Sequence, residues 1–330
     1  MNDRSDRVES PWRRVRRWVG YLIGAALLIA CIVVAARAGD WAMLKEAHLG
    51  AAAFLLYLVA MTLFFSGTVF SAATEPYEQS FRPVSFLDMQ ALIAASTLLN
   101  YLPFRPGLAG RAAYLKHVHG ISYRSSVIIL LRVIGISLVV YVMALAAALT
   151  TGLDGASLLF AAVGPVGLAG LLVFCIFALR ENREQITFGV RTTTGFAATM
   201  RAAEFGFTTL RLMIVFLIVG LHLEVREAIV LASCGMFITL VGITPNGLGL
   251  REWLYGLIAA SGFFCGDVEA GLQLGLTAGL VDRAAEVLVV APTGTASIFY
   301  LFRRARRAEG AKSEIRNPKS ETNPNDQMPQ

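Results

Sequence analysis

Long apolar runs that are almost free of charge constrain this chain more than any other feature of its sequence. They cover 21–36, 51–72, 126–149, 156–179 and 210–221. Most are near the ~20 residues that a helix needs to cross a bilayer. Charged residues make up 16% of the chain and its mean hydropathy is +0.61, whereas a soluble domain carries about 25% charged residues. The sequence therefore predicts an all-α, polytopic membrane helix bundle, with no room for a soluble catalytic domain.

Two further apolar segments each lead into a short stretch rich in proline and glycine. Segment 86–102 is followed by Pro103, Pro106 and Gly107, and segment 227–243 by Pro245, Gly247 and Gly249. Proline removes a backbone donor and glycine permits tight turns, so we expect the backbone to leave regular helix at both breaks. Such backbone persists at membrane depth only inside protein or beside a water-filled cavity. Breaks at matching places in two halves of a membrane protein indicate a binding site.

Four arginines lie in or near these breaks or inside apolar segments. Arg111 and Arg251 each end a Gly-Leu-x-x-Arg sequence, and Arg132 and Arg283 lie within apolar runs. Charge at membrane depth is a functional hypothesis by default, and the planar fork of arginine suits phosphate. Helices that open after each turn would add N–H groups for an anion. We predict a lipid-headgroup site formed by Arg111, Arg132, Arg251, Arg283, Asn246, Glu252 and Asp282.

Each arginine also has a structural interpretation. Arg132 lies about two turns into its run, so its side chain could extend to cytoplasmic headgroups. Arg111 could be one more positive charge on the cytoplasmic side. Asp282, Arg283 and Glu286 are neighbours on one helix face and could pair locally. The sequence leaves both interpretations open.

Lysine and arginine mark cytoplasmic loops, and this rule sets the expected topology. Clusters of arginine precede the first run and follow the last one, so both termini are expected in the cytoplasm. A full crossing by segment 86–102 would place two basic loops outside, one of them with Arg191 and Arg201. If segment 86–102 instead enters the membrane and returns on the cytoplasmic side, both basic loops stay in the cytoplasm. We therefore expect segments 86–102 and 227–260 to be re-entrant hairpins from opposite faces, in two inverted repeats.

Three parts of the chain are expected: a basic cytoplasmic arm at 1–18, a membrane domain at 19–302, and a basic then disordered tail at 303–330. Run 268–302 is long for one crossing, so we expect tilt or a kink at Pro292. We interpret run 21–36 as an uncleaved first helix. The alternative is a signal peptide with a cleavage site near Ala36-Arg37-Ala38.

Several function classes are disfavoured by the residues. The net charge of +6 is explained by cytoplasmic loops, so no nucleic acid partner is expected. Four cysteines lie far apart without a C-x-x-C pair, which favours core positions over a disulfide framework. His117 and His119 have no acidic or cysteine neighbours, so no metal is expected. Nucleotide-binding fingerprints are absent, and neither a cofactor nor a catalytic residue is predicted.

The stretches around both breaks resemble the membrane region of lysylphosphatidylglycerol synthases, the flippase-like domain family. The resemblance lies in Leu99–Arg111, Tyr114-Leu115-Lys116, Gly120-Ile121-Ser122, Arg132, the sequence Thr-Pro-Asn-Gly-Leu-Gly-Leu-Arg-Glu at 244–252, and Arg283. It covers most of 15–302 and implies a bundle with inverted halves that moves lipids between leaflets. Two acidic positions of that pattern hold Leu131 and Gly135 here. The aminoacyl-transferring domain is also absent, so the chain is not expected to make an aminoacyl lipid.

The leading hypothesis is an inner-membrane lipid translocase or transporter for an anionic or phosphate-bearing lipid. Its expected partners are membrane lipids, and either a second copy of the chain or an enzyme of envelope-lipid synthesis. One alternative is a non-transporting scaffold for such an enzyme. Another is a membrane-embedded lipid-phosphate transferase with Asp282 or Glu286 as base, for which the sequence offers no convincing nucleophile–base pair.

Overall fold

The computed structural model describes most of the chain between residues 49 and 316. The described ranges are 49–78, 83–102, 105–150, 190–241, 244–263 and 267–316, with Ala26, Ile29, Ala30, Ile32 and Val33. Within them the regular elements are helices, and no strand occurs. This confirms the all-α prediction for the described part of the chain.

The helices follow one another in the order in which the apolar segments occur. They are α3 (Leu49–Thr74) with the 3-10 turn η1 (Glu75–Tyr77), α4 (Phe86–Leu99), α5 (Pro106–His119), α6 (Tyr123–Thr150), α8 (Val190–Ile218), α9 (Val225–Val241), the 3-10 turn η2 (Pro245–Gly247), α10 (Leu250–Ile258), the π-helical turn η3 (Ala259–Phe263) and α11 (Val268–Arg316).

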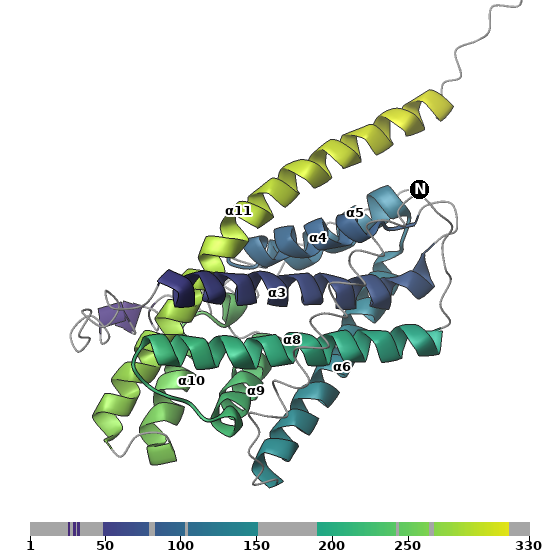
Figure 1. Cartoon of the computed structure of the whole chain (residues 1–330). Helices are drawn as coiled ribbons and strands as arrows, with labels where there is room; N and C mark the ends of the chain where they lie inside the picture. The colour runs from purple at the N-terminus through teal and green to yellow at the C-terminus, as the bar shows by residue number, and fades with distance from the viewer. Residues whose placement is uncertain are drawn as a thin grey trace, which may run out of the picture.

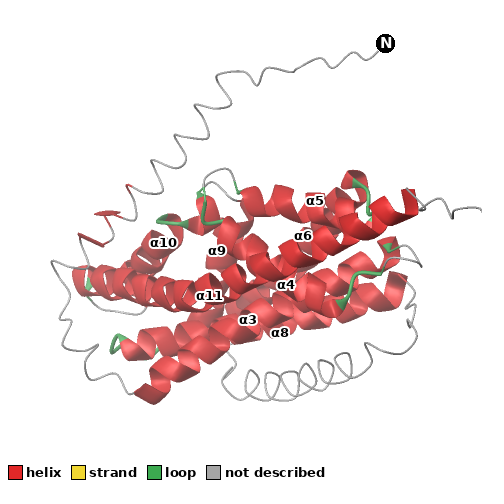
Figure 2. Ribbon diagram, turned by 90° about the horizontal axis from the view of Figure 1, so that it is seen from above, coloured by secondary structure: helices red, strands yellow, loops and turns green. Residues whose placement is uncertain are grey.

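Helices α3 and α8 lie side by side and antiparallel along one side of the bundle (Figures 1 and 2). Phe65 stacks on Phe207 with the ring centroids 5.2 Å apart, and Val59 shares a core with Leu212. The C-terminal half of α3 packs with α4, α5 and the start of α6 in one core. Its N-terminal half packs with α9, α10 and α11 in a second core. Helix α11 runs along both halves of the bundle.

Helix α3 satisfies its threonine hydroxyls within the helix. No charged residue occurs between Leu49 and Thr74. The hydroxyls of Thr62, Thr68 and Thr74 each donate to a carbonyl of the preceding turn, at 2.8, 3.0 and 2.7 Å. Because lipid offers no partner for a polar group, this pattern suits a helix in a membrane.

Three described helices are long and apolar enough to cross a membrane: Leu49–Tyr77, Tyr123–Ala148 and Val268–Ala308. They confirm the runs predicted at 51–72 and 126–149 and the last run. Runs 21–36 and 156–179 lie wholly or largely outside the described residues. The chain is thus compatible with a membrane protein.

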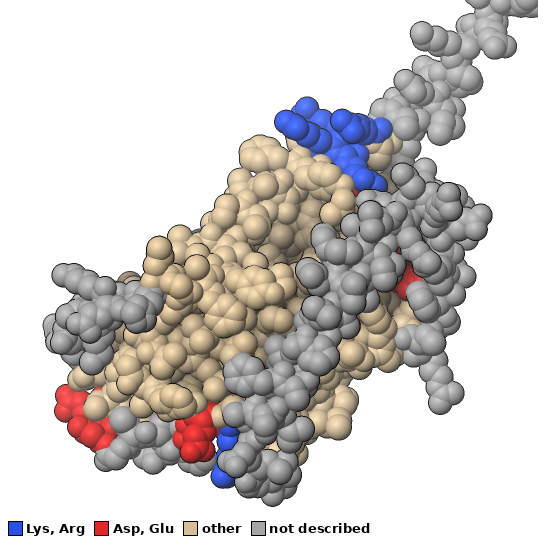
Figure 3. All heavy atoms as spheres, viewed as in Figure 1, with Lys and Arg blue, Asp and Glu red and all other residues tan. Residues whose placement is uncertain are grey.

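The distribution of charged and apolar side chains on the surface is also compatible with a membrane protein. In Figure 3 the largest group of Lys and Arg side chains lies at the top, where α11 leaves the bundle, a smaller one lies with acidic side chains at the bottom, and uncharged side chains cover most of the described face between them. Large apolar side chains are exposed along α6 and α11, among them Leu131, Met143, Leu288 and Phe299.

Two expectations about helix limits are corrected. Helix α8 begins at Val190, so Arg191 and Arg201 belong to a helix and not to a basic loop. Arg201 is buried and pairs with Glu204 at 2.6 Å, which is how an α-helix carries charge at i and i+3. Helix α11 continues to Arg316, past residue 303, where the tail was expected to begin. Figure 1 shows that α11 changes direction along its length, and Pro292 is the proline within it.

Helix α10 lies against α11 at backbone distance. A Cβ added at Gly275 would lie 2.5 Å from the carbonyl oxygen of Tyr255, and one at Gly279 would lie 2.9 Å from the Cα of Glu252. Small residues at such spacing let two helices approach closely. This contact holds the second break against the longest helix.

We therefore predict that Gly275→Ala lowers the stability of the protein. The added methyl group overlaps the backbone of α10, and overpacking of this kind costs about 1–3 kcal/mol. Gly135→Ala on α6 is the matched control, because nothing lies within 4 Å of its added Cβ. Thermal unfolding in detergent should show a lower unfolding midpoint for Gly275→Ala and an unchanged midpoint for Gly135→Ala. Equal midpoints for the two variants would contradict the close contact.

Candidate functional site

Both breaks contain a residue with left-handed backbone. Arg105 has φ 47° and Asn246 has φ 50°, and these are the described non-glycine residues with positive φ. Arg105 immediately precedes α5, which opens with Pro106 at its first position. Asn246 lies inside η2, ahead of α10. Strained backbone of this kind clusters at functional sites and switch regions, so the two breaks share a local conformation as well as a sequence pattern.

The two breaks meet in space. Arg105 of the first break donates from Nη2 to the carbonyl of Thr244 in the second, at 2.5 Å. Arg283 of α11 lies between them: its Nη1 donates to the hydroxyl of Tyr101 at 3.3 Å, and its Nη2 donates to the carbonyl of Asn246 at 3.2 Å. One guanidinium of a candidate membrane span thus contacts both interruptions.

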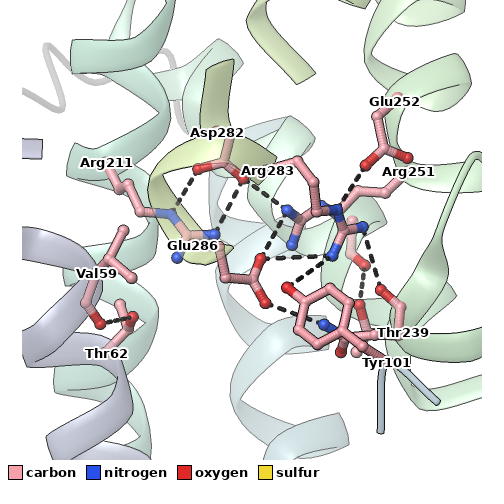
Figure 4. Close-up of polar contacts among 12 residues, drawn as sticks. Val59, Thr62, Tyr101, Arg211, Thr239, Arg251, Glu252, Asp282, Arg283 and Glu286 are labelled. Carbon is pink, nitrogen blue, oxygen red and sulfur yellow. Dashed lines mark hydrogen bonds and ion pairs between the residues drawn. The ribbon is translucent and has the colours of Figure 1, made fainter. Parts of the chain in front are cut away.

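Asp282 is the centre of the buried ion pairs beside the breaks (Figure 4). Arg211 of α8 approaches it with two nitrogens, Nε to Oδ1 at 2.8 Å and Nη2 to Oδ2 at 3.1 Å. Arg251 of α10 adds a contact to Oδ2 at 2.8 Å. Asp282 has no exposed surface. A single carboxylate therefore joins α8, α10 and α11.

Glu286 and Glu252 complete the network. Glu286 lies one turn after Asp282 and accepts from Arg251 at 3.0 Å and from the side-chain amide of Asn246 at 3.0 Å. Arg283 contacts it at 3.5 Å. Glu252, which is fully buried, accepts from Nε of Arg283 at 2.8 Å. Figure 4 shows these groups facing one another between α8, α10 and α11.

The network is balanced in charge. Three guanidiniums face three carboxylates, from Arg211, Arg251 and Arg283 and from Glu252, Asp282 and Glu286. A buried ion persists only when it is paired and hydrogen-bonded. Asp282 lies 14 residues after Val268, roughly 21 Å into the span at 1.5 Å per residue. This depth makes the pairing a requirement of the fold.

The predicted headgroup residues separate into two groups. Arg251, Arg283, Asn246, Glu252 and Asp282 come together in the network. Arg111 and Arg132 lie elsewhere, near the C-terminal end of α3. That place lies on the order of 16 Å along α3 from Val59, which packs in the core around Arg211. The single headgroup site that we predicted is thus divided between two places.

Arg111 and Arg132 have surroundings unlike those of the network. The Arg111 guanidinium lies over the ring of Phe70, 4.1 Å from its centroid. Arg132 donates to the carbonyl of Ala73 at 3.5 Å, to the hydroxyl of Thr193 at 3.0 Å, and to Thr194.

The predicted turn residues lie where the helices are interrupted. Pro106 opens α5, and Gly107 packs so closely on α4 that an added Cβ would lie 2.2 Å from the carbonyl oxygen of Ser96. Gly247 and Gly249 have φ of 71° and 80°, which glycine alone adopts readily. Pro245 begins η2. Pro103 lies outside the described residues.

Sequence reasoning missed Arg211 and Tyr101, and it named Glu286 without including it in the site. Arg211 lies within the run that we placed at 210–221, so the rule that charge at depth has a partner would have singled it out. No pattern in the sequence pairs Tyr101 with Arg283, because 182 positions separate them. Within the described ranges, no group of three or more His, Cys, Asp and Glu side chains could hold a metal ion.

A second polar cluster joins α4, α5 and α11 near the basic end of α11. Asp88 is fully buried and accepts from the hydroxyl of Tyr300 at 3.1 Å. Arg304 lies 3.0 Å from its second oxygen and His119 3.7 Å. The backbone N–H of Asp88 donates to Ser85, which caps α4. This cluster connects α4 and α5, the two helices on either side of the first break, to α11.

Comparison of the chain with family models, with curated proteins and with solved structures gave no match. Its class is therefore defined by its own fold and site: a helical protein compatible with a membrane, with two interrupted helix pairs that meet at a buried ion network.

Loss of Asp282 should be far more damaging than loss of an exposed carboxylate. Asp282→Leu leaves Arg211 without its acceptor, and breaking a buried pair costs about 3–5 kcal/mol. Arg211→Met in the same chain removes the orphaned charge, so the double variant should recover at least half of the lost stability. The exposed Glu269 on α11 supplies the control Glu269→Gln. Additive losses in the double variant, measured by denaturant unfolding, would contradict the pairing.

Proposed function

We propose that this chain is a membrane lipid translocase or transporter that acts on an anionic or phosphate-bearing lipid. In this proposal it is related to the membrane region of lysylphosphatidylglycerol synthases, lies in the cytoplasmic membrane with both termini inside, and contains two inverted repeats. One repeat carries the α4–α5 pair and the other carries the α9–α10 pair.

The observation that carries the proposal is the convergence of both breaks on Arg283. Tyr101 and Asn246 contact its guanidinium from the two interruptions, and Arg105 joins the interruptions directly. Discontinuous helices that meet near the middle of a membrane are where transporters bind their substrates. Interrupted backbone in lipid is tolerated only beside protein or water, so a polar path past this place is consistent with the fold.

The ion network supplies a way to exchange partners. Arg251 contacts both Asp282 and Glu286, and Arg283 contacts both Glu252 and Glu286. A lipid phosphate can accept the same forked hydrogen bonds as a carboxylate. In the proposed step, the phosphate takes the place of Glu286 on the two arginines while the acyl chains stay in the lipid. Left-handed backbone at Arg105 and Asn246 would be the hinge.

The charge balance of the network favours a second candidate, a non-transporting membrane scaffold. Three paired guanidiniums and three carboxylates need no ligand to be stable, and such a network can serve to fix the arrangement of helices. A scaffold of this kind would hold an enzyme of envelope-lipid synthesis. The two candidates predict different effects when one network arginine is removed: a transporter moves lipid more slowly, whereas a scaffold moves no lipid in either form.

Reconstitution into liposomes with fluorescent phospholipids tests the proposal. Arg283→Gln should slow movement of an anionic phospholipid between leaflets by roughly tenfold or more, since a charge-assisted hydrogen bond is worth about 1.5–3 kcal/mol. Arg201→Gln is the matched control, because Arg201 is equally buried and paired with Glu204 away from the breaks. Unchanged movement in both variants, or an equal loss in both, would count against transport through the network.

A further inference from the structure

Arg111 differs from the other deeply buried arginines of the described chain in having no carboxylate beside it. Arg201, Arg211, Arg251 and Arg283 each lie within 3.0 Å of an acidic oxygen. Arg111 is 9% exposed, and its described partner is the ring of Phe70. A ring face attracts a cation but does not replace a counterion. This guanidinium therefore holds an excess positive charge inside the fold.

The acids on the helices around Arg111 have other partners. Helices α3, α5 and α6 contain no Asp or Glu. Glu204 of α8 pairs with Arg201, and the buried Asp88 of α4 pairs with Arg304. An isolated buried charge costs several kcal/mol. A fold that keeps such a group gains from an anion that neutralises it.

Arg132 and the beginning of α8 lie at the same end of α3. Phe70 under Arg111 and Ala73, which accepts from Arg132, are three residues apart and so are neighbours on one face of α3. Arg132 also donates to Thr193 and Thr194, in the opening turns of α8. The N-terminus of a helix carries partial positive charge and free N–H groups. Arg111 and Arg132 therefore contact the same end of α3, and Arg132 links that end to the start of α8.

We propose that Arg111 is the centre of a binding site for a phosphate group, with Arg132 and the start of α8 at its edge. The group belongs to a lipid headgroup or to free phosphate, which share this chemistry. The site deepens the proposed lipid transport and rests on it only for its role: Arg111 holds a headgroup at the first break, apart from the exchange of partners proposed for the network around Asp282. Binding itself does not require transport.

The test compares thermal stability in nanodiscs of phosphatidylcholine alone with that in nanodiscs that also contain phosphatidylglycerol. Arg111→Met keeps most of the side-chain volume and removes the excess charge. It should be at least as stable as the original chain in phosphatidylcholine, since no counterion is lost. Phosphatidylglycerol should raise the melting temperature of the original chain by several degrees and leave Arg111→Met unchanged. The exposed Arg124 gives the control Arg124→Met, which should keep the full rise.

A second arm adds millimolar inorganic phosphate to the phosphatidylcholine nanodiscs. A rise that depends on Arg111 assigns the site to free phosphate, and a rise seen only with phosphatidylglycerol assigns it to the lipid. If neither probe produces a rise that depends on Arg111, the proposal is wrong. Should Arg111→Met fail to fold, native mass spectrometry decides: Arg111→Lys should retain several-fold fewer phosphatidylglycerol molecules than Arg124→Lys, and equal retention would overturn the site. Because lipid movement is measured separately, failure of binding and failure of transport are distinguishable.

Discussion

Asp282 is the group on which the arrangement of the second half depends. It lies on α11 with no exposed surface and accepts from Arg211 of α8 and Arg251 of α10. A carboxylate at this depth is stable only while the guanidiniums stay in place, and they in turn are stable only while it does. Since α10 follows directly on the second break, the ion pairs position that break against α11. The close backbone contact at Gly279 brings Glu252 to the same helix.

The two halves of the chain treat charge in opposite ways. Arg251 and Arg283 are paired with acidic neighbours, whereas Arg111, the counterpart of Arg251 in the first break, has none. Arg132 likewise has no acidic residue at the neighbouring positions Leu131 and Gly135. The network of the second half is neutral, whereas Arg111 in the first half keeps a positive charge without a carboxylate beside it. In the proposed function, the exchangeable ion pairs belong to the network, and a phosphate-bearing lipid suits Arg111.

Much of the fold follows from the sequence because lipid permits few solutions. Uncharged runs had to become helices, and the breaks at Gly107 and Gly247 had to interrupt them. The start of α8 was missed because counting basic residues assigned Arg201 to a loop. In the structure Arg201 is paired with Glu204 within the helix. Contacts between distant segments were also beyond the sequence, since Arg105 meets Thr244 across 139 positions. Apolar pattern fixes helices and their ends, but the partner of a buried charge depends on how the helices pack.

The meeting of the two breaks is the central claim, and crosslinking tests it most directly. In a chain whose four cysteines are replaced, Arg105→Cys with Thr244→Cys should be joined efficiently by a short bifunctional thiol reagent in membranes. Arg105→Cys with Ser261→Cys, in η3 beyond the far end of α10, should not be joined. Equal crosslinking of the two pairs, or none in the first, would show that the interruptions lie apart.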